Sequence, residues 1–137
     1  MENHFNFSDA KFLQKIIDCD FLPIDFSHEA HLRFFWINIK LYGIEQSIIS
    51  IQNQLKNYVE SVGATDKYNI TLSVAAIKAV YHFKLKSNSE NFKDFITEYP
   101  QLKNNFKGLM NTHYGIDIYN SGKSKSQYLQ PDLPPFD

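Results

Sequence analysis

The sequence predicts an all-α protein, a compact single-domain bundle of five to six helices in residues 1–120 followed by an extended tail in residues 121–137. Apolar residues recur at helical spacing through most of the chain, and residues that start or end helices stand at the boundaries of these runs. No run of four or more residues alternates in the way that a half-buried strand does. The chain has 137 residues, of which 43% are hydrophobic and 21% charged, as expected for one globular domain.

The first two predicted helices begin at serine residues that can act as N-caps. Ser8 precedes the first apolar stripe, and Ser27 starts a second helix that we expect to end at Gly43. This second helix is apolar on nearly every side, which is typical of a buried central helix, and we expect Trp36 to be buried on it. The exception is a charged strip: Glu29, Arg33 and Lys40.

Four further helices follow. The third covers residues 45–62 and is amphipathic, and the fourth starts at Asn69 or Thr71 and ends near Lys86. Ser89 is the expected N-cap of the fifth. A sixth helix begins at Pro100 and carries four apolar residues on one face: Leu102, Phe106, Leu109 and Met110.

Charge and cysteine content exclude several classes of protein. Fourteen basic residues stand against 15 acidic ones, so the chain lacks the basic excess of a nucleic-acid binder. No stretch approaches the roughly 18 apolar residues of a membrane span, so we expect no membrane partner. Cys19 is the only cysteine, which excludes an intrachain disulfide and a cysteine-based zinc site. With no export signal at the N-terminus, we expect a cytoplasmic protein.

His28 and His31 form the pair of residues with the clearest chemistry. Their spacing places both imidazoles on one face of the first turn of the second helix, a face that we expect to point inward. The positive end of the helix dipole disfavours imidazolium, and the neutral ring can bind a metal or accept a proton. The two residues therefore supply half of a metal site, or they are partly buried structural histidines that bond backbone groups before the helix.

Arg33 also has two interpretations. Glu29 lies four residues before it, the favoured order for an ion pair on a helix surface, and we prefer a solvated surface pair. In the other interpretation, Arg33 holds an anionic ligand near the histidines.

Three segments together resemble a family of small uncharacterised bacterial proteins. Phe26-Ser-His28-Glu-Ala-His31-Leu-Arg33-Phe-Phe-Trp36 is similar to the family motif F-x-H-x-x-H-[LV]-R-x-A-W. Lys67-Tyr68-Asn69-Ile-Thr71-Leu-Ser73 is similar to Y-H-x-T-[IL]-T, and Gln130-Pro-Asp132-Leu-Pro134 resembles the closing P-D-L-P. The resemblance covers nearly the whole chain in the right order, and it implies no known activity.

The resemblance implies a ligand pocket between the second and fourth helices, closed by the tail around Asp132. Relatives carry a third histidine where this chain has Asn69, and an amide is a poor transition-metal ligand, so we do not expect tight metal binding there. The residues implied in the pocket are His28, His31, Tyr68, Asn69 and Thr71.

The leading hypothesis is that this pocket binds a small polar or anionic ligand or a divalent transition metal. The sequence identifies neither the ligand nor any reaction, so it does not decide whether the protein is an enzyme. The competing hypothesis is a non-catalytic protein-interaction or dimerisation module, such as a homodimer, in which the histidines are structural.

Overall fold

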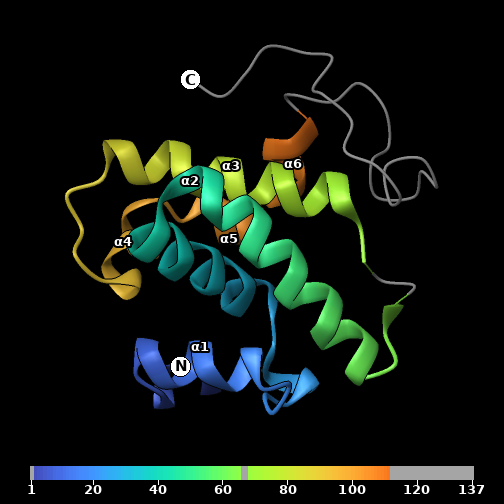
Figure 1. The fold of residues 1–137 in the computed structure, drawn as a ribbon. Helices are drawn as coiled ribbons and strands as arrows, with labels where there is room; N and C mark the ends of the chain where they lie inside the picture. Colours follow the sequence, from blue (N-terminus) through green and yellow to red (C-terminus); the bar gives the residue numbers. More distant parts are fainter. Residues whose placement is uncertain (1, 66–67, 112–137) are drawn as a thin grey trace. The chain divides into compact units, whose positions relative to one another are not determined.

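The computed structural model of the chain describes residues 2–65 and 68–111, and every element in these residues is a helix (Figure 1). The prediction of an all-α protein is confirmed. The chain divides into two compact units, Met1–Tyr68 and Asn69–Asp137, and each is described here by itself. The predicted tail in residues 121–137 lies outside the described residues.

In its described residues, the first unit consists of one long helix, a shorter helix packed on it and two 3₁₀ helices. The 3₁₀ helix η1 (Asn3–Asn6) leads to α1 (Asp9–Ile17), and the 3₁₀ helix η2 (Pro23–Asp25) leads to α2 (His28–Ser61), on which α1 packs. Both predicted N-caps are confirmed. Ser8 Oγ accepts a hydrogen bond from the backbone N–H of Lys11 at 3.2 Å, and Ser27 Oγ accepts one from that of Ala30 at 3.1 Å.

Gly43 divides α2 into two halves. Its φ of 79° and ψ of 173° are not helical, and a residue with a side chain rarely adopts this conformation. The two halves correspond to the second and third helices predicted from the sequence, so the predicted break at Gly43 is confirmed.

An aromatic cluster fills the core of the first unit. The ring of Phe26 meets those of Phe21, Phe34 and Tyr58 edge-on, with centroids 5.0–6.1 Å apart. Tyr58 Oη donates a hydrogen bond to the carbonyl of Phe21 at 2.6 Å, which fixes the second half of α2 to the loop before its first half. Trp36 is 1% exposed, as predicted.

The predicted charged strip of α2 is wrong for two of its three residues. Lys40 is exposed, but Glu29 and Arg33 are only 6% and 5% exposed. The physical reason is that the N-terminal segment, residues 2–7, and the start of α1 provide partners for both side chains. A buried charge is tolerated when it is paired and hydrogen-bonded.

The second unit begins with α3 (Ile70–Lys86), which is capped by Asn69, one of the two predicted caps. The helix α4 (Phe92–Glu98) follows, and its N-cap is Asn91 rather than the predicted Ser89. The hydroxyl of Ser89 instead donates a hydrogen bond to Glu98 at 2.9 Å, so it belongs to the loop between the two helices.

The predicted sixth helix is two short helices, α5 (Gln101–Asn104) and α6 (Phe106–Asn111). Asn105 between them has a non-helical φ of −141°. Its side chain lies against Gly108, where an added Cβ would be only 2.4 Å from Asn105 Oδ1. A side chain at position 108 would therefore force Asn105 to move.

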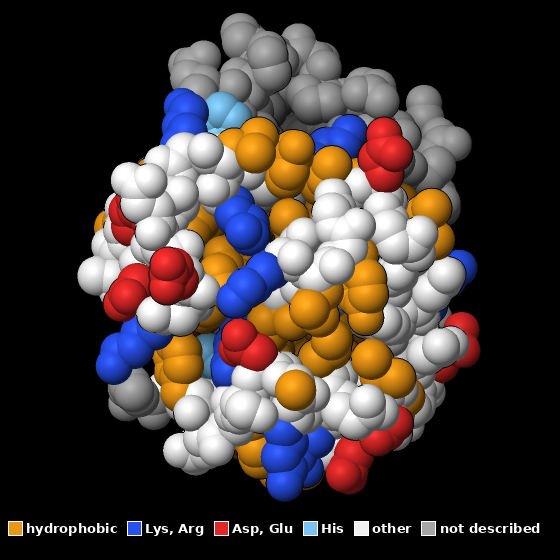
Figure 2. Space-filling model, turned by 60° about the vertical axis from the view of Figure 1, so that its left-hand side comes forward, with side chains coloured by type: hydrophobic (Ala, Val, Ile, Leu, Met, Phe, Trp, Pro, Cys, Tyr) orange, Lys and Arg blue, Asp and Glu red, His pale blue; other side chains and the backbone are white. Residues whose placement is uncertain are grey.

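Large apolar side chains are exposed in both units, among them Leu22, Leu41 and Ile49 in the first and Leu85 in the second. On the face drawn in Figure 2, hydrophobic side chains lie next to charged ones. Within the described residues, no helix is long and apolar enough to cross a membrane.

Trp36→Ala is expected to lower the free energy of unfolding by about 3–5 kcal/mol, because it leaves a large cavity in the buried half of α2. Leu41→Ala on the same helix is the control, since Leu41 is 57% exposed and its truncation should change stability by less than about 0.5 kcal/mol. Urea denaturation followed by circular dichroism measures both. Equal stabilities of the two variants would contradict the assigned orientation of the helix.

Gly43→Ala is expected to destabilise the protein by about 1–3 kcal/mol. No atom lies within 4 Å of an added Cβ, so the loss comes from the backbone conformation and not from a steric clash. Glu45→Ala, an exposed change two residues along the same helix, is the matched control. If the variant at position 43 were as stable as the control, the kink would not require glycine.

Candidate metal centre

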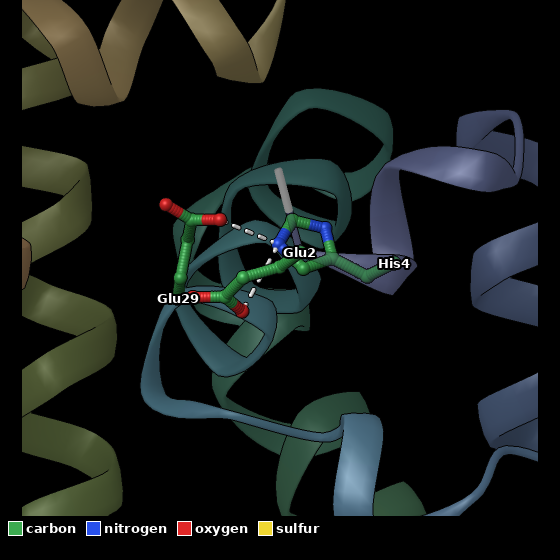
Figure 3. A group of neighbouring side chains, drawn as sticks. All are labelled: Glu2, His4 and Glu29. Atoms are coloured by element: carbon green, nitrogen blue, oxygen red, sulfur yellow. Dashed lines mark hydrogen bonds and ion pairs between the residues drawn. The ribbon is translucent and has the colours of Figure 1, made fainter.

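Two carboxylates of the first unit, those of Glu2 and Glu29, converge on one ring nitrogen of His4 (Figure 3). His4 Nε2 lies 2.7 Å from Glu29 Oε1 and 3.6 Å from Glu2 Oε1. The three candidate ligand atoms are all within 4.8 Å of one another. Glu2 and His4 come from the N-terminal segment, and Glu29 comes from the first turn of α2.

Ser27 explains why Glu2 lies at this position. Its hydroxyl caps α2 by accepting from Ala30, and it also donates a hydrogen bond to the carboxylate of Glu2. The amide of Asn3 adds a hydrogen bond of 3.0 Å to Asp25 Oδ1. Ser27 therefore caps the start of α2 and also holds the N-terminal segment against it. The helix dipole favours the negative charge of Glu2 at this position.

Arg33 holds the other side of the centre. One end nitrogen, Nη1, donates to the carbonyl of His4 at 2.5 Å, and the other, Nη2, donates to the carbonyl of Phe7 and to Asp9 Oδ1, both at 2.9 Å. Its guanidinium also lies over the ring of Phe12, 4.6 Å from the centroid. These contacts position the backbone of the segment that carries His4.

The predicted surface pair of Glu29 and Arg33 is wrong. Both side chains are buried, and the carboxylate that pairs with Arg33 is that of Asp9, while Glu29 bonds His4. A favourable spacing along one helix does not prevent each residue from finding a better partner on another segment.

The centre is rich in negative charge. Burial is the largest cause of a lowered pKa for His4, and it outweighs the opposing effect of Glu29, so the ring is neutral near pH 7. The carboxylates of Glu2 and Glu29 lie against this neutral ring, and that of Asp9 pairs with the guanidinium of Arg33. Together these four charged groups have a formal charge of −2. A divalent cation between the carboxylates would neutralise this charge.

His31 fits the structural interpretation of the histidine pair. Its Nδ1 donates a hydrogen bond to the carbonyl of Ser27 at 2.8 Å, and its ring stacks on that of Phe26 with centroids 3.8 Å apart. Burial lowers its pKa to about 4, so the ring is neutral near pH 7; the main cause is burial and not the helix dipole invoked from the sequence. His28 is exposed, so the inward orientation predicted for it is wrong. Three residues of a helix turn by about 300°, which leaves His28 roughly 60° away from His31.

The other residues of the implied pocket lie on both sides of the boundary between the units. Tyr68 ends the first unit, and burial raises the pKa of its phenol. Asn69 and Thr71 are buried at the start of the second unit, and the amide oxygen of Asn69 accepts a hydrogen bond from Leu72 N at 3.0 Å. Their approach to His28 and His31 stays a prediction.

Neither Glu2 nor His4 is marked by the sequence. They lie in a segment without helical periodicity, and the partner of His4 is 25 residues away. The one signal is the combination of an acidic residue and a histidine close to the N-terminus, which is too common to identify a site.

Comparisons with protein-family models, with curated proteins and with solved structures gave no match. The resemblance of the three motifs to a bacterial family therefore stays a prediction.

The pKa of His31 predicts a loss of stability in acid. The unfolded chain binds a proton at His31 near pH 6.5 and the folded chain near pH 4, so stability is full above pH 6.5 and falls between these values. The loss at pH 4 should approach about 3 kcal/mol, with His4 acting in the same direction. In urea denaturation between pH 7 and 4, His31→Gln should show a shallower loss than the unmodified protein. The control variant His28→Gln should retain most of the slope, because the neighbouring charge of His28 is a smaller cause of the lowered pKa of His31 than burial is. Equal slopes for both variants would contradict the assignment.

Proposed function

We propose that the protein binds a divalent transition-metal ion through Glu2, His4 and Glu29. The observation that carries the proposal is the convergence of one imidazole nitrogen and two carboxylate oxygens within 4.8 Å. Imidazole and carboxylate together suit zinc and other first-row divalent metals. The ligand class is one predicted from the sequence, but the residues differ from the predicted pair, His28 and His31.

The spacing of the ligand atoms supports the proposal. An ion with tetrahedral bonds of about 2.0 Å holds its ligand atoms roughly 3.3 Å apart. The two distances from His4 Nε2, 2.7 Å to Glu29 and 3.6 Å to Glu2, lie on either side of this value. The third pair, the carboxylates of Glu2 and Glu29, lies within 4.8 Å, so an ion bound by all three groups would draw these two carboxylates together.

Charge supports it as well. His4, Glu29 and Arg33 are buried, whereas Glu2 and Asp9 are partly exposed. The two carboxylates that share the His4 ring nitrogen, those of Glu2 and Glu29, repel each other, and a dication between them would attract both.

The number of ligands favours an open coordination sphere. Three protein ligands leave a position for water, as in catalytic zinc sites, whereas structural sites use four. The side chain of Glu2 is 33% exposed while that of His4 is 0% exposed, so solvent reaches the ion from the side of Glu2. The proposal assigns no reaction. The lone Cys19 agrees with the predicted cytoplasmic location.

One observation favours the competing hypothesis of an interaction or dimerisation module with structural histidines. Both ring nitrogens of His4 have protein partners, Glu29 at 2.7 Å and Arg33 Nη1 at 3.4 Å. The centre can therefore serve as a self-contained hydrogen-bond network that only holds the N-terminal segment in place.

Titration of the untagged protein with Zn²⁺ and Co²⁺ distinguishes these hypotheses. We expect binding of one ion per chain by calorimetry, and a visible Co²⁺ spectrum. Glu2→Gln should weaken binding by at least about 10-fold, because loss of an outer-shell partner alone typically has that effect. Glu2 is partly exposed, so this change should leave the fold intact.

His28→Gln is the matched control and should bind the ion as the unmodified protein does. Absence of binding by the unmodified protein would overturn the proposal. Loss of binding in His28→Gln but not in Glu2→Gln would overturn it in favour of the histidine pair predicted from the sequence.

A further inference from the structure

We propose that the ion acts as a clasp, so that its binding holds the N-terminal segment (residues 2–7) on α2 and its removal releases the segment. This inference rests on the proposed function and adds a regulatory consequence to it. Two of the three ligands, Glu2 and His4, belong to the segment, and the third, Glu29, belongs to α2. An ion bound by all three joins two parts of the chain that are 25 residues apart.

Without an ion, the segment is held by polar contacts that partly oppose one another. Ser27 donates a hydrogen bond to the carboxylate of Glu2, and the carboxylate of Glu29 is hydrogen-bonded to the ring of His4. These contacts bring the carboxylate oxygens of Glu2 and Glu29 within 4.8 Å of each other, and two like charges at this distance repel. A divalent ion between the two carboxylates would attract both of them and outweigh their mutual repulsion.

Release of the segment leaves the rest of the unit in place. Arg33 would lose the carbonyls of His4 and Phe7 as acceptors, but it keeps its ion pair with Asp9, the first residue of α1. The helix α1 packs on α2 through its own apolar residues, of which Phe12 and Ile16 are fully buried. The device is therefore local, and it controls access to the segment and its two phenylalanines.

Hydrogen exchange in the full chain tests this inference at individual amides. In η1, the N–H of Phe5 donates to the carbonyl of Glu2 at 3.2 Å, and that of Phe7 donates to the carbonyl of His4 at 3.3 Å. If the ion binds only the docked segment, Zn²⁺ at 100 times its dissociation constant should slow exchange of both amides by about 100-fold. The N–H of Tyr99, which donates to the carbonyl of Phe95 in the second unit, should not change.

Glu2→Gln and Glu29→Gln remove ligands from opposite sides of the clasp. At the same Zn²⁺ concentration, each should reduce the slowing at Phe5 and Phe7 from about 100-fold to about 10-fold or less. His28→Gln should leave it unchanged. Calorimetric binding of Zn²⁺ without slower exchange at these two amides would overturn the clasp while the proposed function stands. Absence of Zn²⁺ binding would overturn both, and equal slowing at Tyr99 would show general stabilisation in place of a local clasp.

Discussion

The buried guanidinium of Arg33 joins three segments of the first unit, and the candidate centre depends on it. It projects from α2, pairs with Asp9 at the start of α1, and donates to the carbonyls of His4 and Phe7 in the N-terminal segment. A planar group with five donors in fixed directions can serve several acceptors at once, which a lysine ammonium cannot reproduce. The acceptors around Arg33 fix the path of the backbone that brings His4 to Glu29.

Much of the fold could be predicted because its signals are local. A capping oxygen accepts from an N–H three residues along, so Ser8, Ser27 and Asn69 reveal helix starts without knowledge of the tertiary structure. Gly43 is also a local signal, because glycine readily adopts the positive φ that ends the first half of α2. The N-cap of α4 was predicted wrongly as Ser89, which shows where local signals stop being sufficient. Ser89 and Asn91 are both good caps two positions apart, and the hydrogen bond from Ser89 to Glu98 that decides between them is not a local feature.

The candidate centre could not be predicted, for a related reason. Helical periodicity assigns charged residues to solvent, but Glu29 and Arg33 are buried because the N-terminal segment and the start of α1 provide their partners. Nothing in that segment repeats at a helical period. The structural interpretation of His31 could be reached from the sequence, since its hydrogen-bond partner is the carbonyl of Ser27, four residues before it. Contacts within one helical turn are accessible to sequence reasoning, and contacts between distant segments are not.

The bend at Gly43 also makes the number of residues between Gly43 and Tyr58 important for the fold. A straight helix of 34 residues would extend about 51 Å, whereas the kinked α2 returns Tyr58 to the carbonyl of Phe21. One residue inserted between positions 43 and 58 would turn Tyr58 by about 100° and shift it by about 1.5 Å, away from this acceptor. Substitutions at exposed positions in the second half of α2 leave this contact in place. Insertions or deletions there would move Tyr58 away from Phe21 and Phe26.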